Sequence, residues 1–165
     1  MAETTLGGNP VHTSGELPEQ GAPAPAYVLT GRDLGDITPA TSAGRSVVLN
    51  VFPSIDTAVC ATSVRRFNEL AGSLENTTVI CVSMDLPFAM NRFCGAEGID
   101  NVLTASGFRS TFGQDYGVTM VDGRLRGLYA RSVVVIDPSG DVAHTELVSD
   151  IGKEPDYDAA LAALN

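Results

Sequence analysis

A cysteine with a hydroxyl three residues before it stands where an apolar run gives way to a helical pattern. Residues 53–60 read PSIDTAVC. An ordinary free thiol is only a few per cent thiolate at neutral pH, and the amides of a helix N-terminus together with a nearby cation favour the reactive anion. The segment therefore predicts nucleophilic thiol chemistry at Cys60.

The commonest fate of a cysteine in a globular domain is that of a small buried hydrophobe, and this alternative applies to Cys60. The context favours reactivity, because Pro53 ends the strand and Asp56 or Thr57 can cap the helix that follows. Cys60 then falls in the first turn, where free backbone amides converge. If Cys60 is inert, Thr57 is simply a capping hydroxyl.

A histidine base for this thiol is not evident. The chain has two histidines, His12 in a glycine-rich flank and His144 in a predicted hairpin strand, and both positions favour surface imidazoles. A Cys-His hydrolase is therefore disfavoured. Arginine is an alternative: lowering a thiol pKa by about three units needs ~4 kcal/mol. One guanidinium about 4 Å away supplies roughly that energy at an effective dielectric near 20.

Spacing alone does not decide which arginine serves. Arg131 stands at the mouth of a strongly apolar strand, where an arginine without an anionic partner is costly. We therefore prefer it to three arginines on predicted helix surfaces: Arg65, Arg66 and Arg92. The alternative is that Arg131 only marks the start of the strand.

Two further cysteines complete the inventory of thiols. Cys94 lies late in a predicted helix, and on its own it is expected to be a packed thiol. Cys81 lies inside an apolar strand and is expected to belong to the core.

Composition limits the classes of protein to consider. A chain of 165 residues with 44% apolar residues is expected to form one domain, residues 1–165, with a single core. Its formal net charge of -10 and the absence of a Lys/Arg stripe argue against a nucleic-acid partner. We expect neither a secretory signal nor a membrane span. Three cysteines, an odd number, favour a reducing, cytoplasmic location over a disulfide framework.

Apolar runs and helical spacing alternate along the chain. Residues 1–26 are rich in Gly and Pro and form a flank with a possible hairpin around Gly7 and Gly8. Strands are predicted at 46–52, 79–84, 132–136 and 142–148, and helices at 57–74, 86–96 with Asp85 as a possible N-cap, 106–112 and 157–164. The order predicts an α/β layer structure in which helices cover both faces of a mixed sheet.

With these residues in place, the chain resembles the thiol peroxidase family of peroxiredoxins, the atypical two-cysteine type. Pro53, Thr57 and Cys60 match the peroxiredoxin pattern of proline, three residues, Thr or Ser, two residues and cysteine. Residues 83–98, SMDLPFAMNRFCGAEG, are similar to the family's resolving-cysteine helix almost throughout. Shorter matches are residues 108–109, 115–118, 128–131 and 154–161.

The resemblance implies a thioredoxin-like fold with an N-terminal hairpin, and reduction of hydroperoxides without metal or organic cofactor. It implies that Cys60 attacks the peroxide, while Thr57, the Cys60 amide and Arg131 hold its oxygens and Pro53 shields the sulfur. It further implies that Cys94 resolves the sulfenic acid as an intrachain disulfide, which thioredoxin reduces. Family members are commonly homodimers and tend to prefer alkyl hydroperoxides.

Two consequences of the resemblance concern particular positions. A bond between Cys60 and Cys94 requires Cα atoms within about 7 Å. Two cysteines borne on helices seldom start that close, so we expect local unwinding during each cycle. The loop 121–127 carries Arg124 where the family usually has proline, so its stiffness and charge are expected to differ.

Two alternative functions remain open. A dithiol oxidoreductase of the thioredoxin type needs a second cysteine close behind the first, whereas Ala61, Thr62 and Ser63 follow Cys60. A redox sensor, in which oxidation of Cys60 changes a partner surface, belongs to a different class. An enzyme turns over continuously with its reductant, and a sensor stalls after one oxidation.

Overall fold

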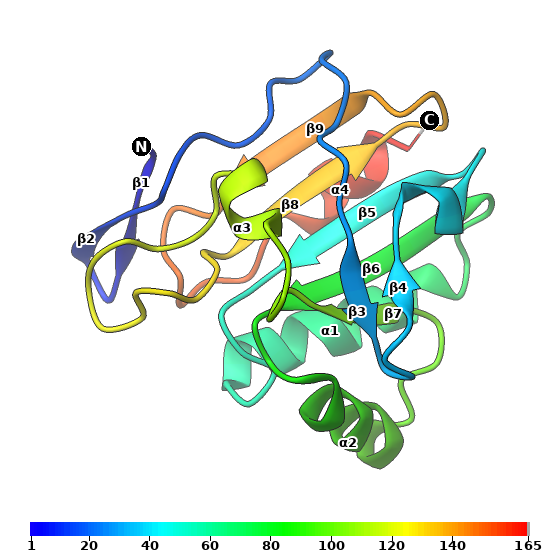
Figure 1. Cartoon of the computed structure of the whole chain (residues 1–165), viewed down its shortest axis with the longest axis horizontal. Coiled ribbons are helices and arrows are strands. Elements are labelled where there is room, and N and C mark those ends of the chain that lie inside the picture. The colour runs from blue at the N-terminus through cyan, green and yellow to red at the C-terminus, as the bar shows by residue number, and fades with distance from the viewer. Residues whose placement is uncertain (165) are drawn as a thin grey trace.

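The computed structural model describes residues 1–164 as a central mixed sheet with a separate N-terminal hairpin (Figure 1). The sheet has seven strands in the order β4-β3-β7-β6-β5-β8-β9. The strands are β1 Glu3–Leu6, β2 Asn9–His12, β3 Leu29–Gly31, β4 Asp36–Ile37, β5 Ser46–Val51, β6 Thr77–Ser83, β7 Leu103–Ser106, β8 Ser132–Ile136 and β9 Val142–Leu147. The helices are α1 Ala58–Ala71, α2 Pro87–Glu97, α3 Phe112–Asp115 and α4 Tyr157–Ala162, with a 3-10 turn at Pro39–Ser42.

The central strands are the near-continuous apolar runs of the sequence. Every residue of β5 and of β8 is buried, as expected of strands covered on both faces. Strand β5 pairs in parallel with β6, and β6 pairs in parallel with β7. Strand β8 pairs antiparallel with β5 and with β9. The carboxyl ends of β5 and β6 consequently meet at one edge of the sheet, where α1 and α2 begin.

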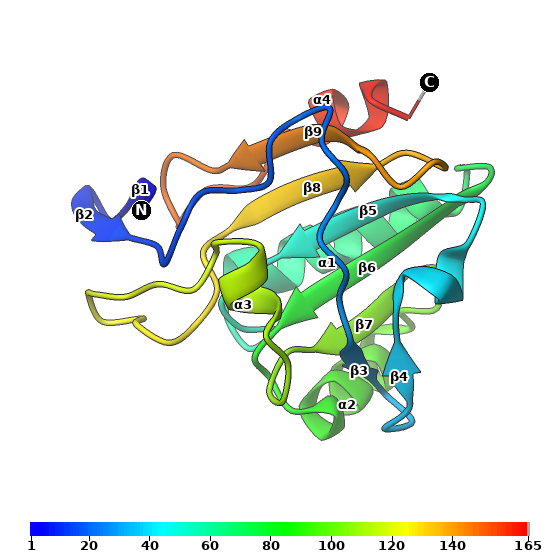
Figure 2. The same cartoon turned by 45° about the horizontal axis from the view of Figure 1, so that its top comes forward.

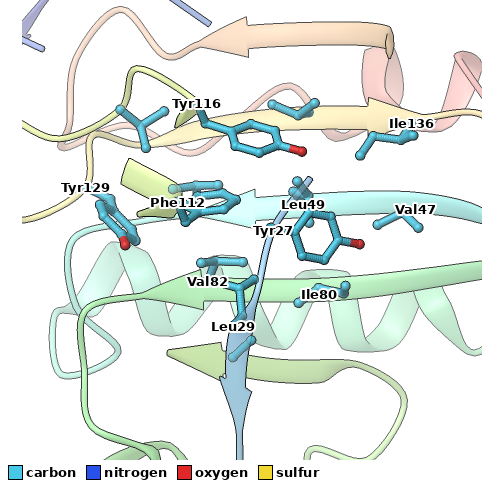
Figure 3. Close-up of a cluster of buried hydrophobic side chains, with 14 of the residues drawn as sticks. Tyr27, Leu29, Val47, Leu49, Ile80, Val82, Phe112, Tyr116, Tyr129 and Ile136 are labelled. Atoms are coloured by element: carbon cyan, nitrogen blue, oxygen red, sulfur yellow. The ribbon is translucent and has the colours of Figure 1, made fainter. Parts of the chain in front are cut away.

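The two faces of the sheet carry different cores because successive side chains alternate between them. On one face α1, α2 and α4 pack over alternate residues of β5, β6 and β8. On the other face an aromatic cluster joins the sheet to α3 (Figure 3), formed by Tyr27, Phe112, Tyr116 and Tyr129. Phe112 stacks on Tyr116 with ring centroids 4.5 Å apart. Figure 2 shows α3 and α1 on opposite sides of the sheet.

The predicted fold class is confirmed, with one element misassigned. The strands expected at 46–52, 79–84, 132–136 and 142–148 are β5, β6, β8 and β9, and the hairpin around Gly7 and Gly8 is β1–β2. The helix expected at 106–112 is wrong, because residues 103–106 form strand β7 and the helix starts at Phe112. Strand β7 forms because β6 pairs along its whole length and β3 pairs with its end. These pairings are tertiary contacts, so the local spacing of apolar residues does not predict them. Strands β3 and β4 were not expected.

The flank of residues 1–26 is attached to the domain by the loop that follows β9. The Thr4 hydroxyl donates to the Val148 carbonyl at 2.6 Å, and the Ile151 amide donates to the Thr5 carbonyl at 2.8 Å. Asp150 accepts from the Thr5 hydroxyl at 2.6 Å and from the Gly8 amide at 3.2 Å. The Thr5 hydroxyl, followed by the backbone amides of the two adjoining loops, lowers the pKa of Asp150 to about 2. Among residues 1–164, no helix combines the length and apolar character needed to cross a membrane.

Asp150→Asn tests this attachment. A carboxylate with a depressed pKa in the folded state stabilises the fold above its unfolded pKa, near 3.9. That contribution is lost as the pH falls through the folded value of about 2. We expect the variant to melt at a lower temperature than the native protein at pH 7, and the difference to shrink in acid. The exposed Asp36→Asn serves as a control, and a difference that is constant between pH 7 and pH 2.5 contradicts the prediction.

Candidate active site

Cys60 lies in the first turn of α1, directly after the loop that leaves β5. Thr57 is the N-cap residue, and the Cys60 side chain is fully buried. The amides of this turn have no partners within the helix, so their partial positive charge faces the start of α1. Pro53 is buried in the loop below this turn. Strand, loop and helix therefore hold the sulfur in a positive and water-poor environment.

Arg131 is in direct contact with this sulfur. It immediately precedes β8, is only 1% exposed, and its Nη2 donates to Cys60 Sγ at 3.2 Å. Its Nε donates to the Ile151 carbonyl at 2.9 Å. The buried Nη1 has no hydrogen-bond partner among the described residues. The guanidinium thus places a buried positive charge beside the sulfur, and its remaining donor is available to an anionic or developing charge.

Thr57 does not act as the side-chain cap that its position allows. Its hydroxyl makes no capping bond to α1, and it donates instead to the Ser54 carbonyl at 2.9 Å. The side chain is exposed at the surface above the start of the helix. A hydroxyl in this position can exchange its internal acceptor for a bound molecule without leaving a helix amide uncapped.

Asp85 takes part in the loop rather than capping α2, so the expectation of an Asp85 N-cap is wrong. Leu86 occupies the N-cap position. The Asp85 carboxylate accepts from the Ser54 hydroxyl at 2.8 Å and from the Ile55 amide at 2.7 Å. The sequence contained a signal for this contact: Asp85 follows one of two parallel strands whose ends meet, and Ser54 follows the other.

The three cysteines are free thiols, and they differ in their surroundings. Cys94 lies in the wound helix α2, is 3% exposed, and its sulfur is 3.8 Å from Thr104 Oγ1. Cys81 lies in β6, and burial raises its pKa to about 12. The structure thus brings Cys60 and Arg131 together and leaves Cys94 packed in its own helix.

The three arginines of the predicted helices and His12 lie elsewhere. Three arginines are exposed on helices in the ion pairs Arg65–Glu97, Arg66–Glu69 and Arg92–Asp56. His12 bridges Asp122 and Glu3 in the hairpin region, and its pKa is raised chiefly by the Asp122 hydrogen bond. Among the described residues, no hydrogen bond joins a histidine to Cys60, and no group of three or more His, Cys, Asp or Glu is placed to hold a metal ion.

A thioredoxin-like sheet that presents a cysteine in the first turn of a helix, against a buried arginine, defines a thiol-based redox protein. The Redoxin family model matches residues 19–161. Thiol peroxidase of Mycobacterium tuberculosis strain H37Rv is 60% identical over 164 residues, 99% of each chain. Thiol peroxidase of Corynebacterium glutamicum is 58% identical over 165 residues, the full length of both.

Solved structures agree with these relatives. A peroxiredoxin-like protein from Aquifex aeolicus superposes with a TM-score of 0.93 at 40% identity, covering 98% of this chain and 95% of that one. A thiol peroxidase from Chromobacterium violaceum shares the fold with a TM-score of 0.89 at 19% identity, covering 97% and 93%. The chain therefore belongs to the thiol peroxidase family of peroxiredoxins.

Arg131→Lys tests the contact with sulfur. A lysine offers one ammonium in place of a planar fork, so it cannot bond Ile151 and Cys60 in the geometry of the guanidinium. We expect slower alkylation of Cys60 by iodoacetamide at pH 7, and oxidation by peroxide slowed about 10²- to 10³-fold, as for the loss of a donor to developing charge. Arg126→Lys, on an exposed loop, is the control. Native alkylation and oxidation rates in Arg131→Lys would show that the contact has no chemical role.

Proposed function

We propose that this peroxiredoxin reduces hydrogen peroxide and alkyl hydroperoxides with thioredoxin as reductant, Cys60 being the peroxidatic and Cys94 the resolving cysteine. The observation that carries the proposal is the 3.2 Å contact of Arg131 Nη2 with the Cys60 sulfur. It is supported by the buried Nη1 beside it, which has no partner among the described residues. The family assignment supplies the reaction class.

In the first step the Cys60 thiolate attacks the terminal oxygen of the hydroperoxide. A sulfur–oxygen bond forms and the O–O bond breaks, which leaves Cys60 as a sulfenic acid and releases an alkoxide that takes a proton to become the alcohol. Negative charge moves from sulfur to the leaving oxygen. Arg131, the Cys60 amide and the Thr57 hydroxyl are the donors we assign to that charge, and Pro53 keeps water from the sulfur.

In the second step the Cys94 thiolate attacks the sulfur of the sulfenic acid. The disulfide forms, and hydroxide leaves and is protonated to water. Cys94 is buried in α2 in the reduced structure, so the last turns of this helix unwind before the step. Thioredoxin then exchanges its dithiol for the disulfide and returns both cysteines to the thiol form.

The setting of this cycle is also part of the proposal. A reductase system that keeps thiols reduced fits the three free cysteines and a cytoplasmic location. Exposed apolar side chains lie at the start of α2 and in the loop after β7, notably Leu86, Phe88 and Phe108. Exposed apolar side chains of this kind support the homodimer common in the family. The role in the cell is antioxidant defence.

Substitution of each cysteine separates their roles. We expect Cys60→Ser to abolish peroxide turnover with thioredoxin, its reductase and NADPH, because the nucleophile is lost. Cys94→Ser should be oxidised once and then stall, because no thiol resolves the sulfenic acid. Cys81→Ser should retain most of the turnover, since its sulfur is buried in β6 and its raised pKa keeps it protonated. Equal loss in Cys60→Ser and Cys81→Ser would overturn the assignment.

The disulfide itself is measured by peptide mass spectrometry after one equivalent of peroxide. We expect the peptides that contain Cys60 and Cys94 to be joined, and the peptide that contains Cys81 to remain free. Continuous NADPH consumption in the same mixture distinguishes an enzyme from a sensor, which stops after one oxidation. A Cys60–Cys81 link, or a single burst without turnover, would refute the cycle.

A further inference from the structure

The carboxylate of Asp85 connects the peroxidatic loop to the hinge before the resolving-cysteine helix. Asp85 follows β6 and stands one residue before Leu86, the N-cap of α2. Its Oδ1 accepts from the Ser54 hydroxyl at 2.8 Å. Its Oδ2 accepts from the Ile55 amide at 2.7 Å and from the Ser83 hydroxyl at 2.6 Å. A half-buried carboxylate that accepts three hydrogen bonds, two of them from one loop, fixes the position of that loop.

From Asp85 a short relay of hydrogen bonds reaches the hydroxyl of Thr57. Ser54, which Asp85 holds by its side chain, uses its carbonyl to accept from the Thr57 hydroxyl at 2.9 Å and from the Thr57 amide at 3.2 Å. The Ser54 hydroxyl also accepts from the Asp56 amide at 3.2 Å. The loop between β5 and α1 is therefore held in part by one carboxylate from the segment that follows β6.

Resting on the proposed function, we propose that Asp85 is a positioning residue for the peroxide step. It sets the loop that carries the Thr57 hydroxyl, which the proposed mechanism assigns as a donor to the peroxide oxygens. The contact of Arg131 with Cys60 does not pass through this loop, because the guanidinium is held by the Ile151 carbonyl. Asp85 thus positions the Thr57 hydroxyl and does not change the intrinsic reactivity of the Cys60 sulfur.

Asp85 also differs in role from the neighbouring ion pair between loop and helix. Arg92 Nη2 lies 2.9 Å from Asp56 Oδ1, and both side chains are well exposed. Arg92 is on α2 itself, so this pair must break when α2 unwinds. Asp85 precedes the helix and can keep its bonds to the loop throughout the cycle. The two contacts of one loop therefore act on different steps.

The experiment measures each step separately in Asp85→Ala, Asp85→Asn and the native protein. Stopped-flow fluorescence gives the second-order rate of Cys60 oxidation by hydrogen peroxide and the first-order rate of disulfide formation. Alkylation by iodoacetamide at several pH values gives the reactivity of the sulfur without a peroxide. The melting temperature reports stability. Asp36→Asn, an exposed carboxylate on the edge strand β4, is the matched control.

We expect Asp85→Ala to oxidise about 10- to 100-fold more slowly, since a misplacement of ~1 Å costs up to about 10²-fold. Its alkylation profile should stay near the native one. Asp85→Asn should be less impaired, because Oδ1 of the amide can still accept from Ile55 while the Ser54 hydroxyl turns to accept from the amide nitrogen. Arg92→Gln should leave oxidation unchanged and raise the rate of disulfide formation about 2- to 5-fold, as for loss of one exposed ion pair.

Native oxidation rates in Asp85→Ala would overturn the proposal. So would an equal fall in oxidation and alkylation accompanied by a lower melting temperature, because that pattern marks a merely structural residue. If Asp85→Ala does not fold, Ser54→Ala removes only the side-chain link and is expected to show the same selective loss on a smaller scale. Failure of the proposed function is distinct, since the native protein itself would then not react with peroxide.

Discussion

A buried guanidinium is the constraint on which the site depends. Arg131 is 1% exposed, and a charge removed from water is costly unless it is paired and hydrogen-bonded. The fold supplies two hydrogen-bond partners, the carbonyl of Ile151 and the sulfur of Cys60. Arg131 is therefore held by these two contacts, and its buried Nη1 has no partner among the described residues. The N-terminal hairpin belongs to this arrangement, because the Ile151 amide is bonded to the Thr5 carbonyl of β1.

Much of this could be predicted from residue types and local pattern. Nearly continuous apolar runs rich in Val predict β5 and β8, and every residue of both strands is buried, as expected of strands covered on both faces. The cost of placing an unpaired arginine at the start of such a run predicts Arg131 as the partner of Cys60. Its carbonyl partner could not be predicted, because Ile151 lies on a loop that approaches through tertiary packing. Strands β3, β4 and β7 were missed for the same reason: each is short, and it is a strand only by virtue of its neighbours.

The parallel pairing of β5 with β6 explains how two distant segments form one site. Parallel strands end at the same edge, so the residues after Val51 and those after Ser83 emerge side by side. The first segment carries the loop to Cys60, and the second carries Asp85 and the start of α2. The sequence pattern of the helix alone predicts that Asp85 caps α2. The carboxylate instead accepts from two donors of the neighbouring loop, the Ile55 amide and the Ser54 hydroxyl.

In the proposed cycle, Cys94 has to stay apart from Cys60 until a sulfenic acid has formed. In the reduced structure α2 is held by exposed polar contacts, such as Arg92 with Asp56, and by the buried side chains Met90, Phe93 and Cys94. Exposed ion pairs contribute little to stability, whereas full burial of one Phe or Met side chain contributes roughly 1.5–3 kcal/mol. Apolar packing therefore sets most of the cost of unwinding α2. In the proposed cycle, the packing of Met90 and Phe93 would therefore set most of the delay between oxidation of Cys60 and formation of the disulfide, and the exposed polar contacts would have smaller effects.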